Sequence, residues 1–282
     1  MNKGVDRIVE SKVRRSEPQV ANTLRDPLLA ADGAVPDIQV VGRCAGILRL
    51  FSPARTSVRS SDLESSLGMQ RTTAHRYLTS LSGAGFLERN EDGSYALGPL
   101  LARVGTIALD SRRVLDVADS FLRRLTSDVH ETTVLSLWGG LGPVVAHVVE
   151  DMERPVHIQV RVGTPLPGDS AQGKVFLAFL QDRATLDRAT AHLPAEMTGQ
   201  LAKELERIRS SGLSVNTNVA RGLRTIAAPV FDRRGRINAA MGVVGTTSSI
   251  PDDLDSGMTK ALEQAARDLS RQLGWQGDAG AL

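Results

Sequence analysis

A run of hydrogen-bonding side chains has the spacing needed to read the edges of nucleic-acid bases. If the segment is helical, Thr72, His75, Arg76 and Thr79 share one side of it, because successive residues are about 100° apart. Arginine makes paired contacts to guanine or phosphate, and hydroxyl and imidazole groups hydrogen-bond to bases. The run therefore predicts a surface that reads double-stranded DNA. The plainer alternative is an amphipathic helix whose polar side only meets water.

Two short helices joined by a tight turn would position this run. Ser61 and Glu64 have the spacing of a capping box, so a first helix is expected to begin near Ser61 and to end at Gly68. A second helix is expected to begin at Thr72 or Thr73, where a hydroxyl can accept from a free backbone amide. Its buried side would be the stripe formed by Ala74, Tyr77, Leu78 and Leu81. This is the helix-turn-helix pattern.

A hairpin follows the second helix. Residues 86–89 and 94–97 flank Asn90-Glu91-Asp92-Gly93, and Asp-Gly between two extended segments favours a hairpin turn. The segment 37–98 is therefore predicted to be a winged helix-turn-helix domain. The expected DNA-binding residues are Ser60, Gln70, Arg71, Thr72, Thr73, His75, Arg76, Thr79 and Arg89.

Charge alone does not identify the DNA-binding residues. Seven arginines oppose five acidic residues between positions 38 and 100. Affinity is therefore expected to come from geometry, helix N-termini and a second subunit. Within that geometry we expect Arg71 and Arg76 to contact phosphate or guanine, and Thr72, Thr73 and His75 to lie nearest the base edges.

A second segment of chemical interest surrounds Ser170. The segment Gly168-Asp169-Ser170-Ala171-Gln172 resembles the G-x-S-x-G motif that surrounds the nucleophilic serine of some hydrolases. It does not match the motif, because Gln172 stands where the second glycine is required. The strand that should precede such a serine is replaced by Pro165-Leu166-Pro167. A loop that enters a helix beside a ligand is the favoured interpretation, and no catalytic residue is assigned.

Metal and cofactor sites are not expected. No two of the histidines have the His-x-x-x-His spacing of a metal-binding helix. Gly139-Gly140-Leu141-Gly142 precedes Pro143 and another apolar segment, so it indicates a hairpin turn and not a dinucleotide loop.

Length and composition fit a two-domain protein. The chain has 282 residues, 34 basic and 32 acidic, and a formal net charge of +2, so any DNA-binding surface must be local. Cys44 is the only cysteine, which excludes an internal disulfide. With no apolar run long enough for a signal peptide or a membrane span, we expect a cytoplasmic location and no membrane contact.

The remaining segments define domain boundaries. Residues 1–36 have mixed charge and no sustained period, which predicts a mobile tail. A first helix is expected around the stripe formed by Cys44, Ile47, Leu48 and Phe51. Residues 99–112 predict a linker helix that begins at Pro99. Its strongly apolar sequence suggests that a second copy of the chain covers it, and a palindromic DNA site would also require a dimer.

Residues 113–275 predict an α+β domain around a largely antiparallel sheet, followed by a tail at 276–282. Helices are expected at 114–129, 173–180, 182–191, 199–211 and 251–273. Strands are expected at 132–138, 144–150, 157–162, 225–231 and 237–245.

Five blocks of sequence, in this order, resemble the IclR family of transcriptional regulators over nearly all of residues 40–275. They are Arg71–Leu78 with Gly85–Leu87, Tyr95–Gly98, Gly173–Ala178, Arg209–Leu213 and Gly222–Val230. The resemblance implies an N-terminal winged helix-turn-helix, a linker helix and a GAF-like C-terminal α/β domain that binds a small effector. It also implies a homodimer, often assembled into a homotetramer.

The resemblance further implies an effector pocket against the sheet. The residues implied to line it are Ser170, Ala171, Gly173, Val215, Leu223, Thr225, Gly242 and Val244. Relatives that bind small carboxylates often have acidic residues before the Gly222 block and a serine pair on the last strand, and this chain has neither. Because an unpaired buried carboxylate is costly, we expect an apolar or aromatic effector. A ring could lie over Gly242 and meet the Thr225 hydroxyl.

Two classes of function remain open at this stage. The first is a sequence-specific DNA-binding regulator controlled by an effector, with repressor favoured over activator. The second is a small-molecule hydrolase that uses Ser170 and has an N-terminal interaction module.

Overall fold

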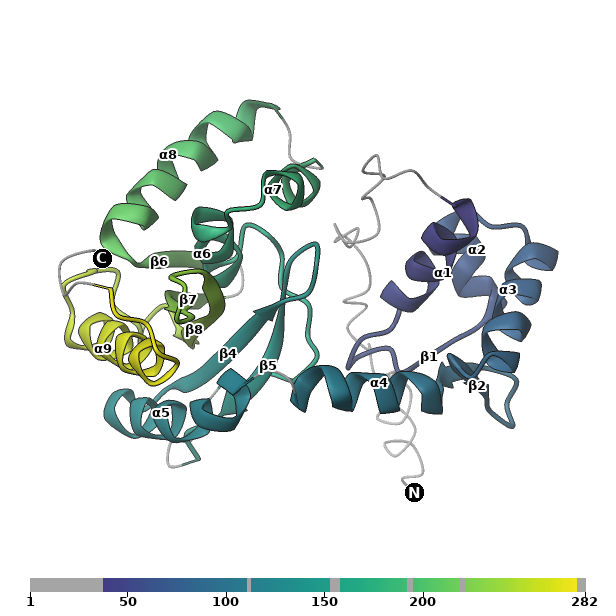
Figure 1. Ribbon diagram of the computed structural model, residues 1–282, viewed down its shortest axis with the longest axis horizontal. Coiled ribbons are helices and arrows are strands. Elements are labelled where there is room, and N and C mark those ends of the chain that lie inside the picture. The colour runs from purple at the N-terminus through teal and green to yellow at the C-terminus, as the bar shows by residue number, and fades with distance from the viewer. Residues whose placement is uncertain (1–37, 111–112, 153–157, 192–194, 219–221, 278–282) are drawn as a thin grey trace, which may run out of the picture.

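The computed structural model describes residues 38–110, 113–152, 158–191, 195–218 and 222–277 (Figure 1). The segments predicted as a tail at 1–36 and most of that at 276–282 lie outside these residues. The first domain contains α1 (Gln39–Arg49), α2 (Ser60–Leu67) and α3 (Arg71–Gly83). Its small antiparallel sheet has the order β1-β3-β2, from β1 (Ser57–Val58), β2 (Leu87–Arg89) and β3 (Tyr95–Leu97).

The core of the first domain follows the predicted apolar stripes. Ile47 of α1, Leu63 of α2 and Leu78 of α3 are completely buried and pack with Leu87 and Tyr95 of the hairpin. Helix α2 ends at Gly68, whose φ of 64° is in the left-handed region that favours glycine. The winged helix-turn-helix prediction is therefore confirmed as a fold.

Helix α2 begins near Ser61 as predicted and α3 begins one residue before the predicted start, but neither helix uses the predicted cap. Helix α2 begins at Ser60, and the Asp62 carboxylate accepts from the backbone N–H of Arg59 at 2.6 Å. Asp62 thus does what the Ser61–Glu64 pair was expected to do. Helix α3 begins at Arg71 without a side-chain cap, so no threonine caps it. Strand β1 was not predicted because two residues are too few to show a period.

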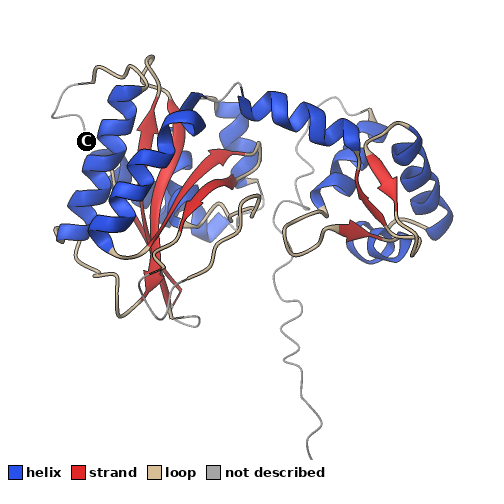
Figure 2. Cartoon of the chain, turned by 90° about the horizontal axis from the view of Figure 1, so that it is seen from below, coloured by secondary structure: helices blue, strands red, loops and turns tan. Residues whose placement is uncertain are grey.

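Helix α4 (Pro99–Asp110) runs from the wing to the second domain (Figures 1 and 2). Three of its large apolar side chains face solvent in this single chain, with exposed fractions of 44% for Val104, 63% for Ile107 and 52% for Leu109. Among the described residues, no helix combines the length and the apolar character needed to cross a membrane.

The second domain is built on an antiparallel sheet of order β5-β4-β8-β7-β6. Its elements are α5 (Arg113–Val129), β4 (Thr132–Trp138), β5 (Pro143–Val149), α6 (Ala171–Phe179), α7 (Arg183–Thr190), α8 (Ala195–Ser211), β6 (Ser214–Asn218), β7 (Leu223–Phe231), β8 (Ile237–Thr246) and α9 (Gly257–Gln272). The α+β prediction with an antiparallel sheet is confirmed.

Two apolar layers hold the sheet between its helices. On one face, Leu122 of α5 and Leu262 of α9 pack against Leu135 and Met241. On the other, Val175 and Phe176 of α6 pack with Ala227 and Ala240, and Ile208 of α8 closes the layer. Figure 2 shows helices lying against the strands in this way.

Several element boundaries were wrong. The strand expected at 157–162 is absent over 158–162, and His157 lies outside the described residues. Gly163, with φ of 84°, turns the chain there. Strand β6 was not predicted because its sequence, Ser-Val-Asn-Thr-Asn, is polar and pairs on one side only, with β7. Helix α9 begins only at Gly257, with Ser256 as its cap.

The start of α6 provides a test of packing. A Cβ on Gly173 would lie 2.4 Å from the carbonyl oxygen of Gly168 and 2.5 Å from that of Pro167. Since backbone must move, we expect Gly173→Ala to lower the free energy of unfolding by about 1–3 kcal/mol. The matched control is Gly199→Ala in α8, where a Cβ meets nothing within 4 Å. It should raise stability by about 0.5–1 kcal/mol. Denaturant unfolding that gives both variants the same shift would contradict this packing.

Candidate DNA-binding surface and effector site

Helix α3 presents the predicted polar side to solvent. Ala74, Leu78 and Leu81 are buried, whereas the opposite side of the helix is exposed. The exposed members of the predicted DNA-binding set are Gln70, Arg71, Thr72, His75, Arg76, Thr79 and Arg89, and the half-buried members are Ser60 and Thr73. The helix thus places its hydrogen-bonding groups on a single surface, with the wing residue Arg89 on the adjoining hairpin.

The arginines on this surface have no acidic partner among the described residues. Neither Arg71 nor Arg76 forms an ion pair or a side-chain hydrogen bond with any described residue, and the same holds for Arg89 and His75. An unpaired guanidinium keeps its five N–H donors available for phosphate or guanine.

An ion pair that the sequence did not reveal anchors the wing. The Arg59 guanidinium pairs with the Asp92 carboxylate and donates to the Asp92 carbonyl oxygen at 2.9 Å. The Ser94 hydroxyl and the Ser94 N–H both donate to that carboxylate, at 2.6 and 3.0 Å. These bonds, with the Arg59 charge as a smaller cause, lower the pKa of Asp92. The start of α2 is therefore joined to the tip of the wing across 33 positions of sequence.

Ser170 has a structural role at the start of α6. Its hydroxyl accepts from the Gly173 N–H at 3.0 Å and donates to the Pro167 carbonyl at 2.6 Å. No histidine or carboxylate among the described residues forms a hydrogen bond with this hydroxyl, so the geometry does not support the hydrolase hypothesis.

Strand register brings four of the five predicted effector residues on strands to one face of the sheet. Ala227 and Ala240 pack under α6, whereas Ile226 and Met241 pack on the opposite face. Because side chains alternate, Leu223, Thr225, Gly242 and Val244 lie on the α6 face. The pairs Thr225–Val244 and Ala227–Gly242 form adjacent rows, which β4 extends with Thr132 and Val134. Leu223, Thr225 and Val244 are half-buried, so α6 leaves the outer row partly open.

Val215 does not belong with this group. It pairs with Ile226 and packs into the layer of α5 and α9. The prediction for this residue was wrong, because a one-residue offset in a strand places a side chain on the other face.

The space over Gly242 is also occupied. A Cβ on Gly242 would lie 2.8 Å from Nε2 of Gln172, so the Gln172 carboxamide rests on the glycine. A ring directly over Gly242 would therefore require the Gln172 side chain to move, and that expectation stays a prediction. With Gln172 in this position, the open part of this face is the row of Thr225 and Val244.

Two basic residues, Lys174 and Arg224, are sequence neighbours of predicted effector residues, and both have other partners. Lys174 pairs with Glu204 of α8, with 2.9 Å between Nζ and Oε1. Arg224 lies on the other face and donates to the Ile250 carbonyl at 2.6 Å and to the Thr217 hydroxyl at 3.2 Å. Neither Lys174 nor Arg224 is therefore a free cation that could pair with a carboxylate over the row of Thr225 and Val244.

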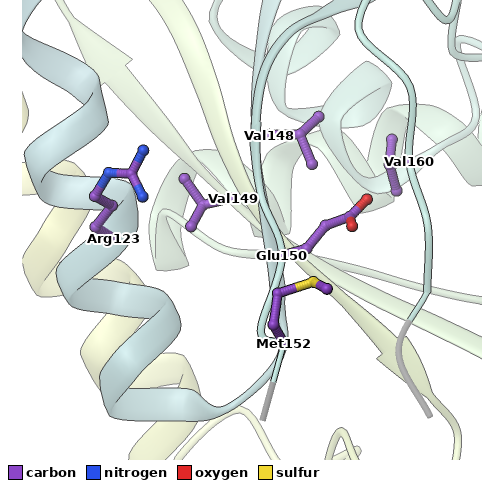
Figure 3. A pocket seen from close by; sticks show the side chains of 6 residues that line it. All are labelled: Arg123, Val148, Val149, Glu150, Met152 and Val160. Carbon is purple, nitrogen blue, oxygen red and sulfur yellow. The ribbon is translucent and has the colours of Figure 1, made fainter. Parts of the chain in front are cut away.

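A shallow pocket of about 300 Å³ lies at the edge strand β5 (Figure 3). Its lining residues are Arg123, Val148, Val149, Glu150, Met152 and Val160. Figure 3 shows Arg123 on α5 to one side of the strand and the Glu150 carboxylate directed to the other, toward Val160. None of the predicted effector residues lines this pocket. For metals, no group of three or more suitable side chains occurs within the described ranges.

Two family models match the chain. They are the IclR helix-turn-helix domain over residues 40–91 and the bacterial transcriptional regulator IclR C-terminal domain over residues 106–271. The chain belongs to the IclR family. As an IclR-family transcriptional regulator it has a DNA-binding helix-turn-helix domain and a C-terminal ligand-binding domain. This assignment confirms the resemblance inferred from the five sequence blocks.

Individual IclR-family relatives match over most of both chains. The glycerol operon regulatory protein of Streptomyces griseus is 32% identical over 84% of this chain and 97% of its own length. The transcriptional repressor IclR of Escherichia coli K12 is 27% identical over 91% of this chain and 98% of its own. A crystal structure of an IclR homologue from Microbacterium hydrocarbonoxydans, complexed with 4-hydroxybenzoate, shares the fold with a TM-score of 0.62 and 23% identity. It covers 83% of this chain and 98% of its own.

The wing anchor can be tested by hydrogen exchange. We expect Asp92→Ala to accelerate exchange of the Ser94 amide several-fold, because that N–H loses its acceptor and Arg59 loses its partner. Since the Asp92 pKa is lowered, the protection in the wild type should be complete above the ordinary carboxyl pKa and lost as pH falls through the lowered one.

The control for this measurement is Glu91→Ala in the same turn. The Glu91 carboxylate has no partner among the described residues, so exchange should not change. Equal Ser94 exchange in the wild type and both variants would contradict the anchoring role of Asp92.

Proposed function

We propose that this IclR-family protein is a repressor that binds a palindromic operator through α3 and the wing, and that releases it in response to a small organic effector. The unpaired, exposed polar side of α3 is the observation that carries the DNA-binding part. The repressor assignment is supported by the E. coli relative named as a transcriptional repressor. An activator of the same family is the alternative.

The DNA contacts follow from the position of each side chain on α3. Arg71 and Arg76 would contact guanine or phosphate, and Thr72, Thr73 and His75 would lie nearest the base edges. Gln70 and Thr79 extend this surface along the helix, while Ser60 at the start of α2 and Arg89 on the wing would contact the backbone. A helix in the major groove reads bases through three or four such side chains.

A second copy of the chain is proposed to cover α4. An apolar surface on α4, formed by Val104, Ile107 and Leu109, is exposed to water, which is unfavourable in free energy. The same surface on a twofold-related copy of the chain would bury it. A homodimer would also present two copies of α3 to the two halves of a palindrome. Further assembly into a tetramer is compatible with this arrangement.

The effector is proposed to be apolar or aromatic and to lie over the row of Thr225 and Val244, beside Ala171 and Gln172. Lys174 and Arg224 are engaged elsewhere, so a short dicarboxylate would have no described cation to compensate its burial. The Thr225 hydroxyl can orient one polar substituent. The structure of the Microbacterium relative, complexed with 4-hydroxybenzoate, supports an aromatic compound.

We expect Arg76→Ala to weaken binding to duplexes selected from a random DNA pool by about 1–3 kcal/mol, because a guanidinium pairs with two acceptors of guanine. Fluorescence anisotropy measures the change. The control is Arg183→Ala, which removes an exposed arginine of α7 and should leave affinity unchanged. Unchanged affinity of the Arg76 variant would remove this residue from the proposed surface.

Thermal denaturation tests the effector class. We expect a neutral aromatic compound such as 4-hydroxybenzyl alcohol to raise Tm, because a ligand that binds only the folded state stabilises it, and expect glyoxylate and pyruvate at the same concentration to have no effect. A rise with the two short acids and none with the aromatic compound would show that the site is built for small carboxylates.

A further inference from the structure

A contact between the two domains lies at the turn that follows α1. The Arg161 guanidinium of the second domain donates to the carbonyl oxygen of Pro53 at 3.4 Å. A Cβ on Gly163 would lie 3.5 Å from Cγ of Pro53, so the Gly163 backbone rests against the proline ring. In Figure 1 the turn between α1 and β1 lies beside this part of the second domain. The second domain therefore touches the first through this loop as well as through α4.

The Pro53 turn is firmly joined to the reading helix. Two backbone hydrogen bonds close the turn: the Ser52 N–H donates to the Arg55 carbonyl at 3.0 Å, and the Arg55 N–H donates to the Ser52 carbonyl at 2.9 Å. Leu50, just before the turn, is buried in the same core cluster as Leu78 of α3. Because a close-packed core transmits displacement, a movement of Pro53 would carry α3 with it.

On the second domain, the contact belongs to residues 158–170, the strap, and both ends of the strap are tied to the proposed effector site. At its start, the Ile158 carbonyl accepts from the Thr132 hydroxyl at 2.8 Å, and Thr132 pairs with Val244 across the sheet. At its end, Ser170 caps α6. The strap therefore leaves the effector row, reaches the first domain and returns to the effector site.

Backbone hydrogen bonds hold the middle of the strap along β5. The Gly163 N–H donates to the Val145 carbonyl at 2.7 Å, and the Val145 N–H donates to the Thr164 carbonyl at 2.9 Å. The Leu166 N–H donates to the Pro143 carbonyl at 2.8 Å. A segment bonded at successive positions moves as a unit, so a change at its α6 end reaches Gly163.

We propose that the strap carries the effector response to the first domain. Without effector, its contact with Pro53 holds α3 in the orientation that binds DNA, and an effector over the row of Thr225 and Val244 displaces the strap and breaks this contact. The inference rests on the effector site and the repressor function proposed above. A ligand shifts an equilibrium only if it binds the two states differently. A ligand over that row lies next to both ends of the strap, so its affinity depends on where the strap lies.

A disulfide between positions 53 and 163 tests the contact without any ligand. Pro53→Cys and Gly163→Cys are combined with Cys44→Ser, which removes the natural thiol. Mild oxidation should consume both thiols within one chain, because a Cβ at position 163 lies close to the side chain at position 53. The oxidised chain should bind selected duplexes within about twofold of the reduced chain, since the contact belongs to the DNA-binding state. Failure to cross-link, or DNA binding at least about tenfold weaker after oxidation, would overturn the proposal.

The cross-linked chain should also resist release from DNA. Saturating 4-hydroxybenzyl alcohol should lower the DNA affinity of the reduced chain at least about fivefold and that of the oxidised chain less than about twofold. An equal loss before and after oxidation would show that the response travels through α4 without the strap, and would overturn the proposal.

A second variant avoids a side chain at Gly163, whose φ of 84° favours glycine. Pro53→Ala combined with Arg161→Ala removes the ring and the donor, and should weaken DNA binding of the ligand-free chain at least about threefold. The control is Arg234→Ala, an exposed arginine in the turn between β7 and β8, which removes the same charge and should leave affinity unchanged. Undiminished DNA binding by the double variant would exclude a role for the contact.

The proposals can fail separately. If 4-hydroxybenzyl alcohol neither binds the wild type nor releases it from DNA, the effector proposal fails, while the cross-link and the alanine pair still decide whether the strap holds the first domain. Conversely, release of the wild type and of the cross-linked chain to the same extent would overturn only the strap.

Discussion

The architecture of the second domain depends on how closely α6 approaches the sheet. Ala171 of the helix and Ala227 and Ala240 of the strands are completely buried against one another, and Gly173 leaves no room for a Cβ beside the Pro167 and Gly168 carbonyls. Small side chains let a helix and a sheet approach closely. Because the Ser170 cap fixes where α6 begins, the same contacts determine which row of the sheet is covered and which stays partly open.

This close approach explains why the candidate effector site is where it is. The first turn of α6 ends over Gly242, so the helix amides and the Gln172 carboxamide meet the row of Thr225 and Val244. The opposite face of the sheet is filled by α5 and α9, and α5 follows α4 in the chain. A ligand that shifts α6 relative to the sheet would change the strands that α5 packs against. Such a shift would connect the effector, through α5 and α4, with the first domain and its helix α3.

The sequence predicted the first domain better than the second. Residues such as Leu63, Leu78 and Gly68 act locally, through a helical period and a left-handed turn, so a single pass along the chain finds them. The Arg59–Asp92 pair joins positions 33 apart, which only the folded hairpin brings together. Strand β6 was not predicted because it is an edge strand with a polar sequence, which shows no alternation of apolar residues.

The candidate effector site shows the same limit. Family resemblance located Ser170, Gly242 and Thr225, but the side of the sheet taken by Val215 depends on register, which no local pattern sets. The contact between Gln172 and Gly242 joins a helix to a distant strand, and only tertiary packing reveals it. Most of the candidate DNA-binding residues, by contrast, lie on the single helix α3, so the spacing alone predicted which of its sides is exposed.

Coupling between the two domains is the central claim of this account, and one titration tests it directly. The affinity of the full chain for a selected duplex is measured with and without a saturating concentration of the aromatic compound that most increases Tm. The account predicts a loss of DNA affinity of at least about fivefold, and an equal loss of ligand affinity in the presence of DNA, because coupling is reciprocal. DNA affinity that does not change at saturation would contradict it.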